Sequence, residues 1–403
     1  MASLMLTLGM AASAVVVAHA GLRRGKQFAT FAGVVTGVHT LAATALMGAL
    51  APLGPVVQAV VAAANVTTYV HYFALGSPAW RPSWYRLLVS VPAHFVGATT
   101  LLSLPFVGLH ALGAPVGLLA VPLVAGLVGL VDSLRAPREV YAVDLDDADA
   151  GSLGRLPLRR ADDQPGALRI VQLTDPHLGP FMSVARLREV AERAVAMKPD
   201  LVLLTGDFLT MESHHEPAKL AEALSPLRPL AGRTFACLGN HDHEALDTVK
   251  RGLSAAGVTL LVDEMTRVST PHGEVEIVGY DFRFREREEH LSSVTARYPR
   301  TPGVRRLALL HDPGAFRHLP PGSVDLVFSG HTHGGQLGLL RLGLPHTIVS
   351  AVSSIPDHGL WGRGRERLYV HRGTGQYGFP LRVGVPAEES LLLLRWPDAA
   401  PAS

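Results

Sequence analysis

The sequence predicts an α/β domain preceded by an α-helical membrane region, and three observations lead to this prediction. No acidic residue occurs before Asp132, and the charged residues there are five basic ones. From Leu168 onward, short apolar runs alternate with amphipathic helical stretches, as in βαβ units. Several of these runs end in polar residues of metal-binding type. The 403 residues therefore divide into a membrane region at 1–134, a linker at 135–167 and an α/β domain at 168–403.

The first region holds enough uncharged sequence for five membrane-spanning helices, because one span takes about 20 apolar residues. An ionised side chain at the bilayer centre costs about 2.5–3.5 kcal/mol on insertion scales. The Pro52/Gly54/Pro55 cluster and the stretch 108–115 divide the longer uncharged runs, since proline and glycine interrupt helices. The expected spans lie near 3–21, 28–51, 56–76, 87–106 and 112–131.

The basic residues of this region lie in alternate loops, after the first, third and fifth expected spans. The positive-inside rule then predicts a multi-pass protein of the cell membrane with an outside N-terminus and a cytoplasmic C-terminal domain. An alternative interprets residues 1–20 as a signal peptide ending in a small-x-small cleavage pattern at 18–20. That segment lacks a basic n-region and is followed by basic residues at 23–26, so we favour a first span.

Composition argues against several other functions. The net charge is only +2 and no dense run of Lys and Arg occurs, so we expect no nucleic-acid partner. A single cysteine, Cys237, excludes an intramolecular disulfide, a CxxC redox motif and a Cys-rich zinc site. Four histidines lie in or near the spans, and we expect neutral imidazoles that hydrogen-bond between helices, since no carboxylate is near enough for a proton relay. They are His39, His71, His94 and His110.

Residues 168–403 contain six short apolar runs of the length expected for buried strands. Amphipathic helical stretches at Ser183–Met197 and Ala218–Leu224 separate the early runs, which indicates βαβ units with functional residues at the C-terminal strand ends. The 135–167 segment before them is rich in Asp, Gly and Pro, as in a linker or short irregular entry strand. The expected strands are Leu168–Thr174, Leu201–Thr205, Thr234–Leu238, Glu276–Tyr280, Leu307–Leu310 and Leu326–Ser329.

Polar motifs follow five of these six runs. Glycine lets the backbone turn tightly after a strand, and strand ends of this kind meet at one edge of a sheet. Carboxylate, imidazole and amide groups together suit Mn²⁺, Fe or Zn²⁺ and do not match an all-oxygen Ca²⁺ cage. Each motif alone is weak, whereas the ordered set is specific and has enough ligands for two metal ions. The motifs are Asp175-Pro176-His177, Gly206-Asp207, Gly239-Asn240-His241-Asp242, His311 and Gly330-His331-Thr332-His333.

This order of motifs resembles the calcineurin-like metallophosphoesterase superfamily. The sequence GHTHGGQ at 330–336 is similar to the bacterial membrane-associated branch that includes the YkuE- and YaeI-type phosphoesterases. The resemblance covers about 168–395 and implies a four-layer α/β/β/α sandwich with a dinuclear metal centre. It implies one ligand set of Asp175, His177 and His333, a second set of Asn240, His311 and His331, and a bridging Asp207.

The chemistry of such a centre also follows from general principles. Two divalent cations about 3.5–4 Å apart make a shared water into a hydroxide near neutral pH and orient a phosphorus for in-line attack. His241 is the candidate general acid for the leaving oxygen, with a hydrogen-bonding role behind the ligands as the alternative. Some members of the superfamily orient this histidine with an acidic residue three positions after the bridging Asp, and here that position is Thr210. The orienting residue is therefore left open among Asp242, Asp312 and Glu212.

These observations predict a membrane-anchored phosphoesterase that hydrolyses a phosphomonoester, phosphodiester or pyrophosphate. The membrane region favours a lipid-linked substrate, and the resemblance suggests UDP-2,3-diacylglucosamine as one example. The alternative is a non-catalytic phosphate-sensing or transport-coupled membrane protein, against which the complete set of seven ligand-type residues argues. Weaker candidates for substrate contacts are His214, His215, His243, Arg283, Arg285, Arg287 and, at the site rim, the Gly373–Gly378 turn with Tyr377.

Overall fold

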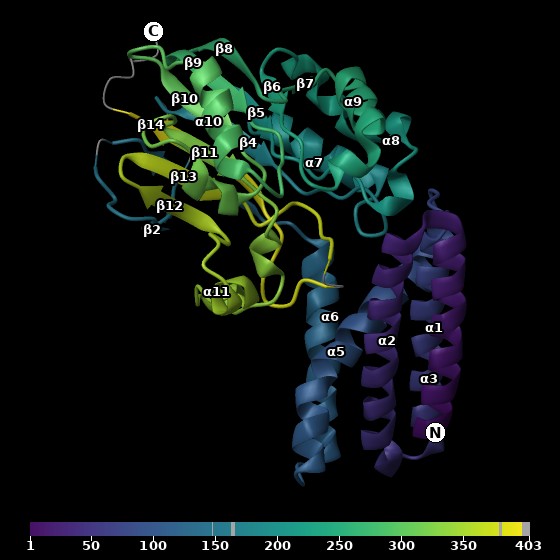
Figure 1. Cartoon of the computed structure of the whole chain (residues 1–403). Helices are drawn as coiled ribbons and strands as arrows, with labels where there is room; N and C mark the ends of the chain where they lie inside the picture. Colours follow the sequence, from purple (N-terminus) through teal and green to yellow (C-terminus); the bar gives the residue numbers. More distant parts are fainter. Residues whose placement is uncertain (147, 163–165, 379–380, 397–403) are drawn as a thin grey trace. The chain divides into compact units, whose positions relative to one another are not determined.

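The computed structural model describes residues 1–146, 148–162, 166–378 and 381–396 (Figure 1). The chain forms two compact units. The helical unit consists of Met1–Leu134 together with two short later segments, Met211–His215 and Gly378–Val383. The other described residues form the sandwich unit, which begins at Arg135.

The helical unit contains five helices of 15 or more residues at the positions of the five expected spans. Glycine with positive φ separates neighbouring helices at Gly25 (φ 85°) and Gly54 (φ 87°), where a residue with a Cβ would be strained. A short helix, α4 (Ser83–Tyr85), and a π-helical turn at Arg86–Ser90 precede the fourth of them. The five are α1 (Ala2–Arg24), α2 (Lys26–Ala49), α3 (Pro55–Leu75), α5 (Val91–Ala111) and α6 (Ala120–Leu134).

Four helical stretches are long and apolar enough to cross a membrane, whereas the sequence predicted five spans. Helix α3 forms where the third span was expected but is not one of the four. Its polar residues Gln58, Asn65 and Thr68 are buried within the unit, whereas most of its valines are exposed. A fifth span therefore stays a prediction. The four stretches are Ala2–Arg24, Lys26–Ala49, Ser83–Ala111 and Val116–Leu134.

Small residues and backbone-directed hydrogen bonds hold the helical unit together. Ala20, Ala32 and Ala43 are buried where helices approach closely, as is usual for helices in a membrane. Arg382, from the later part of the chain, also contacts α6, because its backbone N–H donates to Ser133 Oγ at 3.0 Å. Thus two pieces of chain from beyond residue 200 complete a unit that is otherwise N-terminal.

Two seven-stranded sheets form the sandwich unit. Sheet A has the order β3-β1-β14-β4-β5-β6-β7, and sheet B has the order β2-β12-β13-β11-β10-β9-β8. Sheet A comprises β1 (Arg138–Asp144), β3 (Arg159–Arg160), β4 (Leu168–Leu173), β5 (Leu201–Leu204), β6 (Thr234–Ala236), β7 (Thr259–Leu260) and β14 (Glu389–Arg395). Sheet B comprises β2 (Gly154–Arg155), β8 (Glu264–Thr270), β9 (Gly273–Gly279), β10 (Arg305–Leu309), β11 (Leu326–Ser329), β12 (Gly359–Arg363) and β13 (Glu366–Val370).

The main hydrophobic core lies between the two sheets and contains side chains of both, among them Ile170, Leu203, Leu307 and Phe328. Figure 1 shows α7, α8 and α9 together beside sheet A and α10 beside sheet B. These helices, with the short α11, are α7 (Val184–Ala196), α8 (Pro217–Leu224), α9 (Leu246–Ala255), α10 (Arg287–Arg297) and α11 (Ile348–Val352). The predicted four-layer α/β/β/α sandwich is thereby confirmed.

One part of the expected linker is a full strand. Residues 138–144 form β1, which pairs in parallel with β14 over seven residues. Glu139, Tyr141 and Val143 are buried on one face and pack inside the sandwich, whereas the intervening residues are half-buried. The charged ends of this strand and the Asp-rich stretch after it concealed its alternating pattern. Asp147 and residues 163–165 of the same segment lie outside the described residues.

Candidate metal centre

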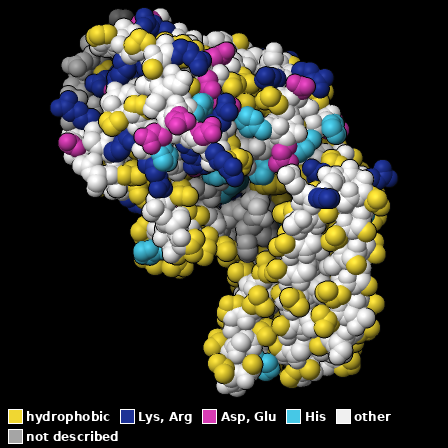
Figure 2. All heavy atoms as spheres, in the orientation of Figure 1, with side chains coloured by type: hydrophobic (Ala, Val, Ile, Leu, Met, Phe, Trp, Pro, Cys, Tyr) yellow, Lys and Arg dark blue, Asp and Glu magenta, His cyan; other side chains and the backbone are white. Residues whose placement is uncertain are grey.

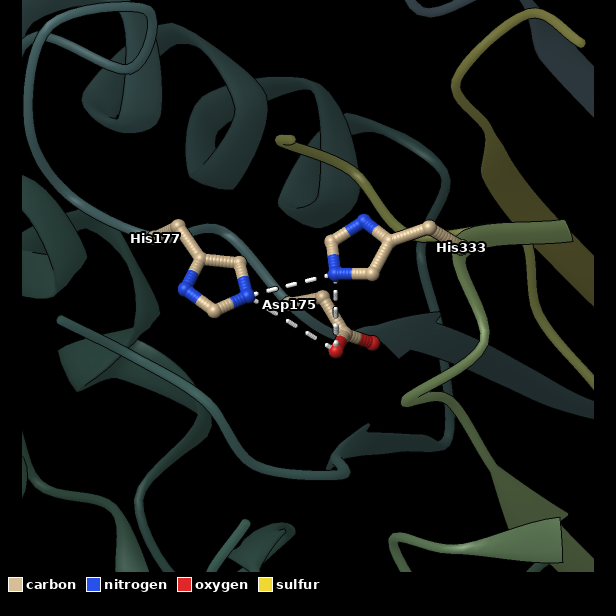
Figure 3. A group of neighbouring side chains, drawn as sticks. All are labelled: Asp175, His177 and His333. Atoms are coloured by element: carbon tan, nitrogen blue, oxygen red, sulfur yellow. Dashed lines mark hydrogen bonds and ion pairs between the residues drawn. The ribbon is translucent and has the colours of Figure 1, made fainter. Parts of the chain in front are cut away.

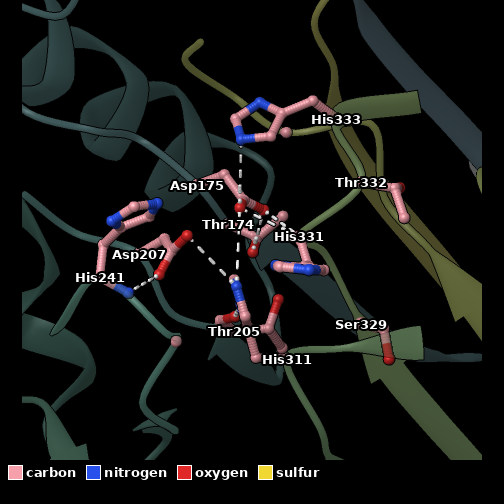
Figure 4. Close-up of polar contacts among 12 residues, drawn as sticks. Thr174, Asp175, Thr205, Asp207, His241, His311, Ser329, His331, Thr332 and His333 are labelled. Atoms are coloured by element: carbon pink, nitrogen blue, oxygen red, sulfur yellow. Dashed lines mark hydrogen bonds and ion pairs between the residues drawn. The ribbon is translucent and has the colours of Figure 1, made fainter. Parts of the chain in front are cut away.

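The predicted ligands follow adjacent strands of both sheets, at the ends where the chain leaves each strand. Asp175 and His177 come after β4, and Asp207 comes after β5 of the same sheet. In sheet B, His311 follows β10, and the neighbouring strand β11 leads into His331 and His333. Figure 4 shows the side chains of Asp175, Asp207, His311, His331 and His333 pointing toward one another from the two sheets.

The first group consists of Asp175, His177 and His333, which are all buried and whose ligand atoms lie within 4.8 Å of one another. His177 Nε2 is 3.2 Å from His333 Nε2, and His333 Nε2 is 3.4 Å from Asp175 Oδ1 (Figure 3). Two imidazoles and a carboxylate that converge in this way could hold a divalent metal ion.

The second group consists of Asp207, His311 and His331, again with ligand atoms within 4.8 Å of one another. Asp207 Oδ2 lies 3.3 Å from His311 Nε2 and 3.6 Å from His177 Nε2 of the first group. Asp207 is therefore placed between the two groups. The Oδ1 atom of Asn240, the seventh predicted ligand, is buried and has no hydrogen-bond partner among the described residues. The Nδ1 atom of His331 is likewise buried and without a partner among them. Buried polar atoms without partners are costly, and a bound cation would satisfy both.

Backbone carbonyls orient two of the imidazoles. His311 Nδ1 lies 2.6 Å from the Thr205 carbonyl oxygen, and His177 Nδ1 lies 3.3 Å from that of Leu209. Because a carbonyl oxygen only accepts, each Nδ1 must donate, and each Nε2 then faces the carboxylates. Metal-ligating histidines are held by the same arrangement, which fixes both the tautomer and the ring direction.

Backbone conformation also marks this site. Nine described non-glycine residues have a positive φ, a region that side chains with a Cβ rarely adopt. Five of the nine are predicted ligands, and such strain persists where the surrounding structure enforces it for function. The five are Asp175 (φ 50°), His177 (46°), Asp207 (57°), His331 (68°) and His333 (52°).

Two glycines are required by close approach to the carboxylates. A Cβ on Gly239 would collide with Asp207 Oδ1, and a Cβ on Gly330 would collide with Asp175 Oδ2. Any larger residue at either position would push a carboxylate out of its place. The glycines noted in the sequence motifs thus make room for ligands, in addition to turning the chain.

Burial dominates the electrostatics of the site. It raises the pKa of Asp175 to about 6 and lowers the pKa of His177 to about 3. It also lowers the pKa of His331, to about 4. Burial would lower the pKa of His311 as well, but the Asp207 carboxylate raises it to about 10. The low pKa values of His177 and His331 keep these two imidazoles deprotonated, which is the form that a divalent cation binds.

His241 is at the rim of the site and is oriented by a residue that was not predicted. Its Nδ1 lies 2.8 Å from Glu244 Oε1, and this hydrogen bond raises the pKa of His241 against the opposing effect of burial. Its backbone N–H donates to Asp207 Oδ1 at 2.9 Å. Glu244 comes three residues after His241 in the turn Asp242–Ala245, and this spacing is the signal that could have identified it.

The three residues considered for this orienting role are engaged elsewhere. Asp242 accepts backbone N–H groups of Asp207, Phe208 and Gly239, each at 2.8 Å, and so shapes the loop instead. Asp312 accepts the Gly314 N–H and pairs with Arg287 at 2.7 Å. Glu212 belongs to the helical unit, where Arg81 and Arg86 are its charged neighbours. The carboxylate that the described residues place on His241 is Glu244, which was not among the three alternatives.

Of the weaker candidates, Tyr377 lies closest to the site. Its ring stacks on that of His177 with 4.6 Å between centroids and lies 4.7 Å from that of His241. His243 instead pairs with Asp281 at 3.0 Å, and Arg283 lies 3.7 Å from the same carboxylate. The Gly-rich turn therefore supplies one wall of the site.

Comparison with known proteins identifies the family. The family model for calcineurin-like phosphoesterases matches residues 168–335. Phosphodiesterase YaeI of Escherichia coli is 31% identical over 237 residues, which cover 58% of this chain and 84% of YaeI. The chain belongs to the calcineurin-like phosphoesterase family. It is accordingly a hydrolase that acts on phosphoester bonds, and the family and the two ligand groups indicate divalent metal ions as cofactors.

Two further relatives bear on the branch and on the substrate. Metallophosphoesterase YkuE of Bacillus subtilis is 28% identical over 56% of this chain and 79% of YkuE. UDP-2,3-diacylglucosamine pyrophosphatase LpxG of Chlamydia trachomatis is 28% identical over 260 residues, which cover 52% of this chain and 78% of LpxG. The predicted YkuE/YaeI-type branch is thus confirmed.

Proposed function

We propose that this protein is a membrane-anchored phosphoesterase that uses two divalent metal ions to hydrolyse a phosphate ester or pyrophosphate of an amphiphilic substrate. The observation that carries this proposal is the pair of ligand groups with Asp207 between them, 3.3 Å from His311 and 3.6 Å from His177. A single-metal site would need only one of the two groups.

Each predicted ligand has a place in the proposed centre. Mixed carboxylate, imidazole and amide donors favour Mn²⁺, Fe or Zn²⁺. The carboxylate of Asp207 has two oxygens and suits the bridging position. The first ion would be held by Asp175, His177 and His333, the second by Asn240, His311 and His331, and both by Asp207.

When bound, two such cations supply a hydroxide near neutral pH and neutralise charge on the transferring phosphoryl group. His241 would donate its Nε2 proton to the leaving oxygen, because Glu244 occupies Nδ1 and favours the protonated ring. Tyr377, stacked on His177, would keep that imidazole in place and close one side of the site to water. The protein residues would thus position the ions and donate one proton to the leaving oxygen.

The direct test is hydrolysis of bis-p-nitrophenyl phosphate by the full-length protein in detergent with Mn²⁺. Asp207→Ala should lose both the activity, by at least about 10³-fold, and bound metal, because a bridging ligand serves both ions. Asp162→Ala changes an exposed aspartate and is the matched control. Full metal content and activity in Asp207→Ala would contradict the proposed centre.

The role of His241 needs a substrate whose leaving group requires protonation. His241→Ala should lower kcat by about 10²–10⁴-fold for an alkyl phosphodiester, the usual contribution of a general acid. The loss should be much smaller for the p-nitrophenyl ester, whose leaving group departs without a proton. Equal losses for both substrates, or loss of metal, would contradict the proton-donor role.

Three observations support an amphiphilic substrate. The helical unit has four stretches able to cross a membrane, and one relative, LpxG, is a pyrophosphatase of a diacylated sugar nucleotide. The sandwich unit also has an exposed apolar segment between Leu339 and Val352, in the chain that follows the ligand His333 (Figure 2). Its exposed large side chains are Leu339, Leu342, Leu344, Ile348 and Val352.

With all five predicted spans crossing the bilayer, α3 among them, we place the sandwich unit in the cytoplasm, as the positive-inside rule suggests. The basic residues Arg23, Arg24 and Lys26 lie at the junction of α1 and α2, and Arg81 precedes α4. Protease added to intact cells should leave the sandwich unit uncut, and protease added to inverted vesicles should digest it. Digestion from outside intact cells would reverse the orientation without affecting the catalytic proposal.

A further inference from the structure

The helical unit contains a cavity that is independent of the metal centre. It has a volume of about 250 Å³ and lies among α2, α3 and α5. Its walls are apolar at Val34, Val38 and Leu101, and polar at His39, Thr68 and His71. A volume slightly below that of drug-sized sites is large enough for one aliphatic chain or a small head group.

The polar wall of this cavity consists of atoms that lack partners. Thr68 Oγ1 and His71 Nδ1 are buried and have no hydrogen-bond partner among the described residues. The buried Nε2 atom of His39 has none either, although the His39 ring contacts the Asn65 side chain. The three residues are only 3–5% exposed. In a membrane no water is available to compensate such groups, so they are expected to be satisfied internally or by a ligand. Three such polar atoms on one wall of the cavity indicate a ligand that carries oxygen atoms.

The apolar wall opens toward lipid. Val34 and Val38 line the cavity and are 60% and 48% exposed on α2, which is long and apolar enough to cross a membrane. An aliphatic chain could therefore enter from the bilayer along this helix. The side of the cavity near α5 includes His94, whose ring centroid is 5.0 Å from that of His71.

The residues that line the cavity indicate a ligand without net charge. No described lining residue is Lys, Arg, Asp or Glu, so an anionic or cationic group would be buried without a counter-charge. A metal ion is also disfavoured. Among the described residues, the groups whose ligand atoms converge within 4.8 Å are the two at the metal centre, and these histidines form no third.

We propose that this cavity binds a neutral amphiphile, with its aliphatic chain along Val34 and Val38 and its hydroxyl or ester oxygens on His39, Thr68 and His71. This binding goes beyond the proposed hydrolysis, because it uses none of the metal ligands. A neutral lipid held in the helical unit would give the three buried polar groups their missing partners. It would also give the histidines a role beyond joining helices.

The test uses the full-length protein in phosphatidylcholine nanodiscs with a monoacylglycerol whose chain carries a photoreactive diazirine. After illumination, mass spectrometry should locate the label on peptides of α2 and α5 that line the cavity. Unlabelled monooleoylglycerol should compete, whereas hexadecane, which lacks oxygen atoms, should not. Labelling spread evenly over all lipid-facing helices, or equal competition by hexadecane, would overturn the proposal.

Two pairs of variants sharpen this test. Val38→Trp fills the cavity and should reduce labelling by about tenfold, whereas Leu41→Trp, on the exposed surface of the same helix, should not. His71→Leu should weaken competition by monooleoylglycerol by up to about tenfold, the effect of one lost hydrogen bond. His110→Leu is the matched control, since the His110 ring is bonded to the Ala114 carbonyl outside the cavity.

Folding and catalysis are controlled separately. Each variant is first checked for a single symmetrical peak in size-exclusion chromatography and for hydrolysis of bis-p-nitrophenyl phosphate, which Val38→Trp should retain. Labelling is then repeated in Asp207→Ala without metal, where it should be unchanged. Loss of labelling in Val38→Trp and Leu41→Trp alike would refute the cavity as the binding site, whether or not the protein is a hydrolase.

Discussion

The two units of this protein distribute apolar and charged side chains in opposite ways. In the helical unit, large hydrophobic side chains such as Leu22, Val56 and Leu87 are widely exposed, while Thr36, Asn65 and His71 are buried. In the sandwich unit the core between the sheets is apolar, and only six of the described large hydrophobic residues are exposed. Figure 2 shows the same contrast in the surface colours. The difference shows that each unit is built for a different solvent.

The buried charges give the same contrast. The sandwich unit buries several ion pairs, including Arg306 with Glu276 at 2.7 Å and Arg372 with Glu388 at 3.1 Å. The long helices of the helical unit rely on backbone acceptors: Thr36, Thr40 and Thr44 each donate to the carbonyl four residues earlier. The buried charged residues of this unit lie near the end of α6 and in the two later segments, at Asp132, Glu212 and Arg382. Charge pairs can hold sheets together in water, whereas a membrane unit uses weaker polar contacts that cost less to bury.

Among the substitutions that test this comparison, Glu388→Gln should have the largest effect on stability. Glu388 accepts hydrogen bonds from the Tyr369 hydroxyl and the Arg372 backbone N–H, and it forms an ion pair with the Arg372 guanidinium, so the substitution removes one charge partner of a buried guanidinium. We expect a loss of about 3–5 kcal/mol in the stability of the sandwich unit. Chemical unfolding followed by tryptophan fluorescence measures it, with exposed Glu288→Gln on α10 as the control.

The same residue predicts a pH dependence. Burial alone would raise the pKa of Glu388, but His371 and Arg372 lower it from 4.5 to about 2. A depressed carboxyl pKa stabilises the folded state above the unfolded value, so this contribution is present above pH 4.5 and disappears as the pH falls toward 2. In Glu388→Gln, stability should change less over this range. An unchanged slope would contradict the ion pair.

The next largest effect concerns packing in the helical unit. A Cβ on Gly126 of α6 would collide with Thr99 on α5, so Gly126→Leu should force the two helices apart. Overpacking of this kind costs about 1–3 kcal/mol. Thermal unfolding in detergent measures it, and Gly108→Leu, where a Cβ has open space, is the control. Equal melting temperatures for the two variants would mean that α5 and α6 do not pack this closely.

A smaller effect, on catalysis alone, is expected from Glu244→Gln. A neutral amide would no longer favour the protonated form of His241, so kcat for an alkyl phosphodiester should fall about tenfold. KM and metal content should stay unchanged, since Glu244 is not one of the proposed ligands. Glu244→Asp should recover part of the loss. A rise in KM with unchanged kcat would assign Glu244 to substrate binding instead.

The smallest effect would test whether the sandwich unit has a membrane-facing part of its own. Leu342 is 74% exposed within the apolar segment, and Leu342→Glu should raise KM a few-fold for a substrate presented in lipid vesicles. Hydrolysis of soluble bis-p-nitrophenyl phosphate should not change. Phe284→Glu, at a residue that is 75% exposed elsewhere on the unit, is the matched control. Equal responses of both variants would leave the segment without a specific role.

The sequence alone identified the features that depend on local composition and order. The absence of acidic residues before Asp132 marked the helical unit, and the motifs after successive strands marked the predicted ligands. These signals are local because a membrane span needs continuous apolar sequence, and a strand end brings its next residues to a sheet edge. The sandwich and the family followed from the same order of motifs.

Tertiary structure decided what depends on contacts between distant segments. Glu139 lies on the buried face of strand β1, and a charged residue in the sequence argues against a buried strand. The structure shows that Arg372 pairs with this charge. The choice of Glu244 over Asp242 as the partner of His241 depends on which way one loop turns. Helix α3 buries polar residues that make its sequence ambiguous as a span. Glu244 is a close neighbour of His241 in the sequence, and there the fold decided only which carboxylate of one turn meets the ring. Burial of Glu139 and of the polar residues of α3 depends on segments that only folding brings near, so their neighbours in the sequence cannot reveal it.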